Sequence, residues 1–392
     1  MRAVTWQGHR HVAVENVADP KLVEDDDVII SVTSAAICGS DLHLYEVLGP
    51  FMHRGDILGH EAIGVVQEAG PAVRELAVGD RVVVPFNICC GHCYMCRRGL
   101  QSQCETTQVR EHGSGAALFG YSELYGSVPG AQAELLRVPF ANYGPIKITD
   151  DRPDERYLYL SDILPTAWQA VAYADPEPGS TVVVIGLGPV GQLCARIAAG
   201  KGHRVIAVDP IDYRREIASE HGIESIDLDQ QTVETIMDAT EGRGADASID
   251  AVGMEAHGSP AKVAQRAAGM LPDTVARKLM TNAGVDALGA LSLALQTARR
   301  GGTVSLAGVY GGMTDPLPMM QMFDRQLQLR MGQCNVRHWI DELMPLVDDA
   351  EDPLGLESLA THRLPLVAAP DAYRMFQRKE DNCLKIILHP QR

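Results

Sequence analysis

The sequence predicts an α/β protein in two parts, a β-rich, barrel-like domain and a doubly wound domain built on a parallel sheet. Short β-branched runs broken by Gly, Pro and Asp extend from about residue 12 to residue 84, a pattern typical of an all-β region. Strand-like and helix-like segments alternate from residue 181 to about 307, which indicates a parallel sheet with crossover helices. A glycine-rich turn at 186–191 directly follows the first buried strand of this second part.

The first part consists of runs such as Asp27–Val32 and Gly79–Val84, in which β-branched residues favour strands and Gly and Asp favour turns. The pattern changes after Asp162, and the Pro-Glu-Pro-Gly turn at 176–179 then precedes a buried strand. We therefore expect a first domain at 1–162, a second at 163–309, and a return of the chain to the first domain at 310–392.

Composition excludes several classes of function. The chain of 392 residues is 46% hydrophobic, enough for more than one core, and has a formal charge of -17. Because this charge repels phosphate backbones and anionic lipid, we expect neither nucleic acid nor membrane as a partner. No apolar leader or run long enough to span a bilayer is present, so the sequence predicts a cytoplasmic protein.

Four cysteines form the most specific motif, C-x2-C-x2-C-x7-C. Thiolates this close together are typical of a closed, structural zinc site with no open coordination position. Disulfides or an iron–sulfur cluster are the alternatives, but the predicted compartment disfavours the former and the spacing the latter. The predicted ligands are Cys90, Cys93, Cys96 and Cys104, and the adjacent Cys89 is the spare thiol.

The glycine turn predicts a dinucleotide site. Strand 181–185 is followed by Gly186, Gly188 and Gly191, with Pro189 and Val190 opening a helix. The three glycines permit a tight turn, close approach of a pyrophosphate, and packing of helix on strand.

Asp209 ends the next strand, about twenty residues further on. Its carboxylate can accept hydrogen bonds from a ribose and would repel a 2′-phosphate, which favours NAD over NADP. Arg214 and Arg215 follow closely and leave NADP open.

Cys38 and His60 lie in two further motifs, Cys-Gly-Ser-Asp-Leu-His at 38–43 and Gly-His-Glu at 59–61. Either residue alone would more often be a buried structural residue than a ligand. With Gly70, Val73, the Gly-Asp-Arg-Val run at 79–82 and the four-cysteine loop, however, the chain resembles the zinc-containing medium-chain alcohol dehydrogenases along nearly its whole length.

This resemblance implies a GroES-like catalytic domain joined to a Rossmann domain. It also implies a catalytic zinc ion with three protein ligands, which are Cys38, His60 and Asp162. Many family members have cysteine at the position of Asp162. Aspartate there and Gly39 make the chain similar to the glutathione-independent formaldehyde dehydrogenase and formaldehyde dismutase subgroup. The stretch Gly-Ser-Val-Pro-Gly-Ala-Gln-Ala-Glu at 126–134 and the long segment after Gly253 support the same similarity.

The resemblance assigns further roles around the zinc. Ser40 takes the substrate proton and His43 passes it on toward solvent, while Asp41 and Glu61 lie behind the ligands. The residues assigned to the cofactor by the resemblance are Thr166 against the nicotinamide, Lys385 at the pyrophosphate, and Arg214, Val252 and Gly308 elsewhere in the site.

An Ala-, Met- and Leu-rich segment at 254–284 lengthens one crossover. It is either a packing decoration or, as in the subgroup, a cover that holds NAD in place.

The predicted function is hydride transfer from a small alcohol or hydrated, formaldehyde-like aldehyde to NAD, with two zinc ions per chain and no glutathione. Alternatives are an aldehyde dismutase with bound NAD, a dehydrogenase of larger alcohols or polyols, and, remotely, a non-catalytic dinucleotide-binding protein. The family also implies a homotetramer, with a dimer as the alternative.

Overall fold

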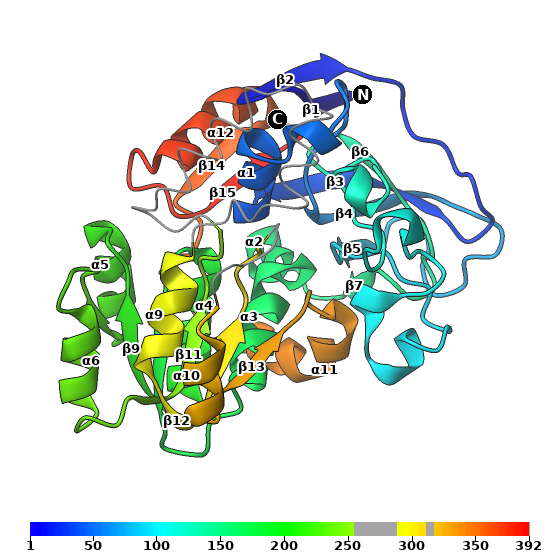
Figure 1. Ribbon diagram of the computed structural model, residues 1–392. Coiled ribbons are helices and arrows are strands. Elements are labelled where there is room, and N and C mark those ends of the chain that lie inside the picture. Colours follow the sequence, from blue (N-terminus) through cyan, green and yellow to red (C-terminus); the bar gives the residue numbers. More distant parts are fainter. Residues whose placement is uncertain (255–287, 311–316, 392) are drawn as a thin grey trace. The chain divides into compact units, whose positions relative to one another are not determined.

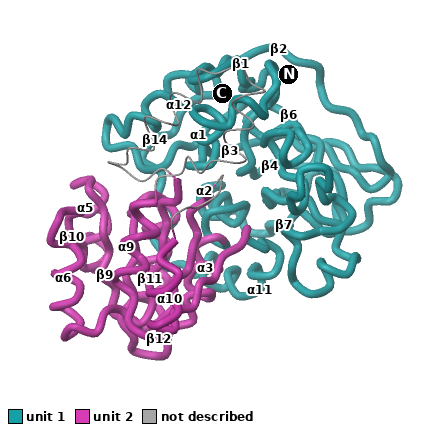
Figure 2. Tube along the Cα trace, viewed as in Figure 1, with its two compact units in different colours: residues 1–165, 334–392 teal, residues 166–333 magenta. Residues whose placement is uncertain are grey.

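The computed structural model describes residues 1–254, 288–310 and 317–391, so the predicted segment 254–284 lies outside the described residues except for Met254. The chain forms two compact units, shown in Figure 2. The first contains residues 1–165 and 334–392, and the second contains residues 166–333. The chain thus returns to the first unit at Cys334, later than the expected 310, because strand β13 (Gln328–Met331) still belongs to the sheet of the second unit.

The first unit is built on a seven-stranded sheet whose long central strands are β3 (Val28–Ile37) and β4 (Glu61–Ala69). Val28, Ile30 and Val32 of β3 are fully buried, because alternate positions of a strand face the core. The strand order is β14 (His362–Pro365), β15 (Ile386–His389), β3, β4, β5 (Arg81–Val84) and β7 (Ile146–Ile148), with β6 (Leu135–Val138) also paired to β3.

The first unit also contains a two-stranded hairpin and several helices (Figure 1). Helix α1 (Gly39–Glu46) begins where β3 ends, and the Asp41 side chain caps it by accepting the Cys38 N–H at 2.9 Å. The others are the hairpin of β1 (Arg2–Gly8) and β2 (His11–Asn16) and the helices α2 (Asp154–Leu158), α11 (Val336–Val347) and α12 (Ala369–Arg378).

The second unit is a six-stranded parallel sheet. Its strand order is β10 (Glu224–Ile226), β9 (Arg204–Val208), β8 (Thr181–Ile185), β11 (Ala245–Asp250), β12 (Ala298–Leu306) and β13. The order reverses at β8, as in a doubly wound fold, which confirms the predicted fold class. The helices are α3 (Ile163–Ala174), α4 (Pro189–Gly200), α5 (Asp212–Glu220), α6 (Thr232–Ala239), α9 (Gly289–Thr297) and α10 (Met319–Asp324).

The turn between β8 and α4 depends on two glycines. Gly186 has φ of +89°, a conformation that other residues rarely adopt. At Gly191, an added Cβ would lie 1.8 Å from the Gly186 carbonyl oxygen. Pro189 then starts α4, where its missing N–H costs nothing.

We expect Gly191→Ala to destabilise the protein by roughly 1–3 kcal/mol, because the new methyl group forces strand and helix apart. Gly200→Ala, in the same helix but with nothing within 4 Å of the added Cβ, is the matched control and should be neutral or slightly stabilising. Urea unfolding of both variants tests this. Equal stability of the two would show that the close approach at Gly191 does not constrain the turn.

Candidate metal centre and nucleotide site

Three predicted ligands of the catalytic zinc come together in the first unit. Ligand atoms of Cys38, His60, Asp162 and Glu61 all lie within 4.8 Å of one another. The Cys38 Sγ is 3.3 Å from the Asp162 Oδ2, and the His60 Nε2 is 3.2 Å from the same oxygen. All four residues are buried.

The antiparallel pairing of β3 and β4 accounts for much of this convergence. Ala36 lies opposite Glu61, so Cys38 and His60, just beyond the paired ends, are neighbours. Asp162 lies outside this sheet, at the junction between the 3₁₀ turn Tyr159–Ser161 and α3. The sheet register thus fixes two donors, and a helix junction brings the third.

The electrostatics of this cluster fit a bound cation. Burial, together with the nearby Asp162 and Glu61 carboxylates, raises the pKa of the Cys38 thiol to about 11. Burial also raises the pKa of Glu61. A divalent ion would favour the ionised forms of these groups, and a set of one sulfur, one imidazole and one carboxylate is typical of zinc.

Two residues of α1 flank His60 on opposite sides. The Ser40 Oγ lies 3.1 Å from the His60 Nε2, and the Asp41 Oδ1 lies 3.2 Å from the His60 Nδ1. Burial alone would lower the pKa of His60, but the facing Asp41 carboxylate raises it well above its usual value. His43 is buried on the same helix. Of the two residues predicted to handle the proton, Ser40 therefore adjoins the metal cluster, and His43 lies on the same helix as Ser40.

The four-cysteine loop forms a second cluster, with its four sulfurs within 4.8 Å of one another. Backbone N–H groups point at the sulfurs: that of Cys90 at the Cys104 Sγ (3.4 Å), and those of Cys96 and Glu105 at the Cys93 Sγ (3.5 and 3.4 Å). Burial opposes ionisation of Cys104, but hydrogen bonds from the Cys90 N–H and from Thr106 and Thr107 lower its pKa to about 6. Such N–H donors stabilise thiolates, so this loop fits zinc as well.

The second unit gathers the predicted cofactor residues at the carboxyl ends of its strands. The Asp209 carboxylate accepts the N–H groups of Leu187 (2.7 Å) and Ile211 (2.9 Å), which ties it to the glycine turn. The guanidinium of Arg214 lies 3.7 Å from the same carboxylate. The carboxylate and the guanidinium therefore both adjoin the glycine turn.

Asp250, at the end of β11, organises the neighbouring turn. It accepts the N–H of Val252 through its side chain (2.9 Å) and that of Gly308 through its carbonyl (2.9 Å). A Cβ at Gly186 would lie 2.5 Å from a Val252 methyl group, so Val252 packs directly against the glycine turn. Thr166 is half-buried in α3.

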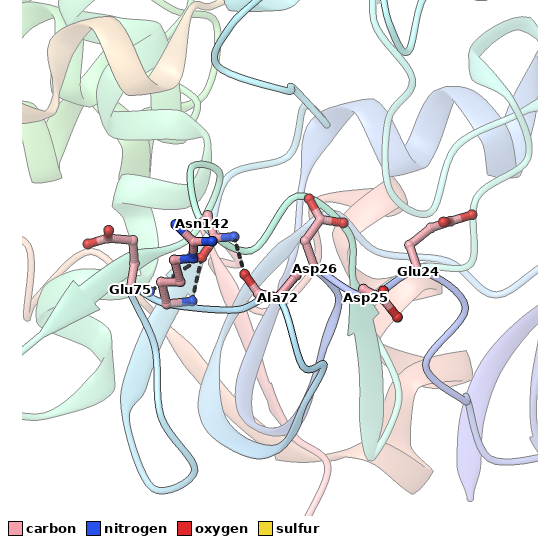
Figure 3. A pocket seen from close by; sticks show the side chains of 7 residues that line it. Glu24, Asp25, Asp26, Ala72, Glu75 and Asn142 are labelled. Atoms are coloured by element: carbon pink, nitrogen blue, oxygen red, sulfur yellow. Dashed lines mark hydrogen bonds between the residues drawn. The ribbon is translucent and has the colours of Figure 1, made fainter.

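A surface pocket of about 570 Å³ lies elsewhere in the first unit (Figure 3). Asn142 closes one side of it by accepting the Arg74 N–H at 2.7 Å and donating to the Ala72 carbonyl at 2.9 Å. The other lining residues are Glu24, Asp25, Asp26 and Glu75. Its acidic lining contains none of the predicted site residues and would repel a phosphate.

Two family models match this chain, one in each of its two units. Residues 24–148 match the alcohol dehydrogenase GroES-like domain, and residues 189–272 match the zinc-binding dehydrogenase family. The zinc-type alcohol dehydrogenase-like protein AdhB of Bacillus subtilis is 40% identical over 100% of both chains. This chain belongs to the zinc-containing medium-chain alcohol dehydrogenase family. The resemblance found in the sequence is thereby confirmed at the level of the family, and the protein is an oxidoreductase.

Two further similar proteins are a formaldehyde dismutase and an alcohol dehydrogenase. The formaldehyde dismutase of Pseudomonas putida is 31% identical, over 96% of this chain and 95% of its own. The alcohol dehydrogenase TADH from Thermus sp. ATN1 superposes with a TM-score of 0.82 at 34% identity, over 99% of both chains. Among the described residues of this dehydrogenase, no helix is both long enough and apolar enough to cross a bilayer.

Lys385, which the resemblance assigns to the pyrophosphate, forms an ion pair with Glu61. Its ammonium group is fully buried in the first unit, ion-paired with Glu61 and 3.1 Å from the Ile37 carbonyl. Burial lowers the pKa of Lys385, but the Glu61 carboxylate more than compensates and raises it. Lys385 is therefore a counter-ion of Glu61. Its contact with a pyrophosphate stays a prediction.

Gln132 and Tyr373 are two buried residues that were not predicted to belong to the site. Both side chains are fully buried and are hydrogen-bonded to each other. Gln132 belongs to the stretch 126–134, which entered the prediction only as a whole. The one available signal was a polar residue in an otherwise apolar context, which is a weak indication.

We expect Lys385→Met to destabilise this dehydrogenase by up to about 3–5 kcal/mol, because Glu61 is left as a buried carboxylate without its counter-ion. Without the lysine, the pKa of Glu61 in the folded variant would rise further above its value in the unfolded chain. The folded variant would therefore take up a proton at Glu61 more readily than the unfolded chain. The stability deficit relative to the unsubstituted protein should therefore shrink as pH falls from 8 toward 5.

Urea unfolding at several pH values measures this deficit. Lys385→Arg, which keeps the charge, is the control and should lose much less stability. A pH-independent deficit shared by both variants would indicate a packing defect instead of a lost ion pair.

Proposed function

We propose that this protein is an NAD-dependent dehydrogenase that oxidises a small alcohol or a hydrated aldehyde such as formaldehyde, without glutathione. The observation that carries the proposal is the convergence of Cys38, His60 and Asp162 within 4.8 Å in a buried cluster. Three protein ligands of this kind leave one coordination position for a substrate oxygen. A carboxylate in place of a thiolate donates less electron density, which suits a zinc ion acting on a weakly acidic hydrate.

When bound, zinc would supply Lewis acidity at the substrate oxygen, and NAD would supply the hydride acceptor. Ser40, beside the His60 Nε2, is placed to accept the substrate proton. His43, on the same helix, is the candidate that passes the proton on. Asp41 holds the other ring nitrogen of His60, so that the Nε2 lone pair stays directed at the metal position.

The four cysteines of the loop 90–104 would hold the second zinc ion in a structural role. All four positions would be occupied by sulfur, so this site would contribute to stability and not to chemistry. The loop packs on the rest of the first unit through Ser102, whose N–H and hydroxyl both donate to the Asn335 Oδ1 (3.0 and 2.9 Å). Loss of this metal would therefore weaken the contact of the loop with Asn335, at the start of α11.

NAD, in place of NADP, is supported by Asp209. Its carboxylate is buried and held by two backbone N–H groups beside the glycine turn. A 2′-phosphate would bring negative charge to this carboxylate. Arg214 offsets part of that charge at 3.7 Å, so a residual activity with NADP is compatible with the proposal.

Aldehyde dismutation is the second candidate, favoured by the relative named formaldehyde dismutase. In that reaction one aldehyde is oxidised and another is reduced while the nucleotide stays bound. The same ligands and proton path would serve both directions.

We further propose a cytoplasmic homo-oligomer, with a tetramer as the leading assembly. Supporting this, β13 is the edge strand of the six-stranded sheet, and exposed edges invite pairing. Large apolar side chains are exposed on β13 and on the preceding α10, at Met319, Met320, Phe323 and Met331.

The two proposed zinc sites can be separated by paired variants. Asp162→Ala should remove one zinc ion per chain and lower turnover roughly 100-fold or more, since even residues outside a metal's ligand set cost up to that much. Cys96→Ser should instead remove the other zinc ion and lower the thermal stability. Metal analysis, activity and thermal unfolding of both variants are the measurements. Full zinc content and activity in Asp162→Ala would exclude it as a ligand.

Whether the nucleotide exchanges with solution or stays bound can be measured without knowing the substrate. We expect the purified protein, once denatured, to release little nucleotide if it is an exchanging dehydrogenase, and near-stoichiometric NAD if it is a dismutase. Formaldehyde added without cofactor provides the second readout, because only a dismutase turns over under those conditions. Release of NADP would contradict the assignment of Asp209.

A further inference from the structure

A chain of hydrogen bonds connects the C-terminal helix α12 to the ligand His60. The Tyr373 hydroxyl donates to the Gln132 Oε1 at 2.8 Å. The Gln132 Nε2 donates in turn to the Asp41 Oδ2 at 3.1 Å and to the Ala36 carbonyl at 3.2 Å. Asp41 then faces His60 through its other oxygen. All of these links lie within the first unit.

The orientation of the Gln132 amide follows from its partners. Asp41 and Ala36 both present oxygen acceptors, so only the NH₂ end of the amide can face them. The oxygen end must then face Tyr373, whose hydroxyl can donate. Burial raises the pKa of Tyr373 well above its usual value, so it remains a donor. The reversed amide would place two oxygen atoms against the oxygen of Gln132 and is excluded.

The backbone holds Gln132 equally firmly. Its N–H donates to the Leu58 carbonyl at 2.9 Å, and its carbonyl accepts the Val4 N–H at 2.8 Å. A Cβ on Gly59 would lie 2.4 Å from the Gln132 Cγ, so this side chain fills the space next to the residue that precedes His60. Neither end of the Gln132 side chain can move without breaking one of these contacts.

The last link sets the state of His60. The Asp41 Oδ1 and the His60 Nδ1 have no hydrogen bond to any other described residue, and they lie 3.2 Å apart. The Asp41 Oδ2 is meanwhile occupied by two donors, the Cys38 N–H and the Gln132 NH₂. A carboxylate pinned at one oxygen presents the other in a fixed direction, and this directs the Nδ1 proton of His60 away from the metal position.

We propose that Gln132 and Tyr373 are positioning residues for the catalytic metal: they fix Asp41, which fixes the ring and tautomer of His60. This inference rests on the proposed function, because it takes His60 as a zinc ligand. It adds two residues to the machinery, on elements distant in sequence from every ligand. Their effect is on how tightly His60 holds the metal, and they touch neither the substrate nor the metal.

Zinc release from the full-length holoenzyme to a chromogenic chelator tests the proposal. Gln132→Met keeps the size of the side chain but removes the donor, and should speed the loss of one of the two zinc ions roughly tenfold. Tyr373→Phe removes the donor that holds the Gln132 oxygen and should act in the same direction, to a smaller extent. The other zinc ion, held by the cysteine loop, should leave at an unchanged rate.

Two variants separate hydrogen bonding from packing. Gln132→Glu has the same shape but replaces the donor with an oxygen facing Asp41, so at pH 8 it should lose zinc at least as fast as Gln132→Met. Tyr45→Phe removes a hydroxyl from a buried ring 5.5 Å from that of Tyr373, outside the chain, and should behave like the unsubstituted protein. The visible spectrum of the cobalt-substituted enzyme reports the same change of ligand geometry without turnover.

The outcomes distinguish this inference from the proposed function. If His60→Ala retains both zinc ions, the ligand assignment itself is wrong. If His60→Ala loses one ion while Gln132→Met, Gln132→Glu and Tyr373→Phe release zinc at the unsubstituted rate, only the positioning role is overturned. It is also overturned if these variants lose both ions equally fast in step with a lower melting temperature, since that is the result of a general packing defect.

Discussion

The register between β3 and β4 is the constraint on which the candidate metal centre depends. Antiparallel pairing of Ala36 with Glu61 places Cys38 and His60 side by side at the end of the two strands. A slip of one residue would turn every side chain of a strand to the opposite face. The register is protected by the core beneath it, where Val28, Ile30 and Val32 are fully buried. The ligand geometry is thus inherited from hydrophobic packing several residues away.

Around that register the protein concentrates charge in a buried region, which is costly unless every charge has a partner. Glu61 has Lys385, and Asp41 faces His60 while accepting two N–H groups. The Cys38 thiol and the Asp162 carboxylate lie 3.3 Å apart, and the His60 ring lies 3.2 Å from the same carboxylate. A divalent ion bound here would stabilise the ionised forms of both acidic groups, so metal binding and the stability of the first unit are coupled.

Local sequence patterns sufficed for features that local chemistry determines. The strand, turn and helix at 181–200 follow from hydrophobic period and glycine placement, and the cysteine loop follows from its spacing. Asp162 could be connected with Cys38 only through family resemblance, because no period in the sequence relates positions so far apart. The ion pair of Lys385 could not be predicted for the same reason: its partner Glu61 is 324 residues away, and a lysine in a β-run gives no sign of being buried. The hydrogen bond between Gln132 and Tyr373 could not be predicted either, because the two residues are 241 positions apart.

The return of the chain to the first unit bears on how the protein is made. Strand β15 pairs with β3, opposite Ala35 and Ile37, and directly follows Lys385, the lysine that neutralises Glu61. During synthesis on the ribosome, β3 and β4 emerge hundreds of residues before β15, while the whole second unit is translated in between. The nascent metal centre therefore exists for a time with an open sheet edge and an uncompensated carboxylate. Its final assembly must wait for the last part of the polypeptide, and the second unit has the opportunity to fold first.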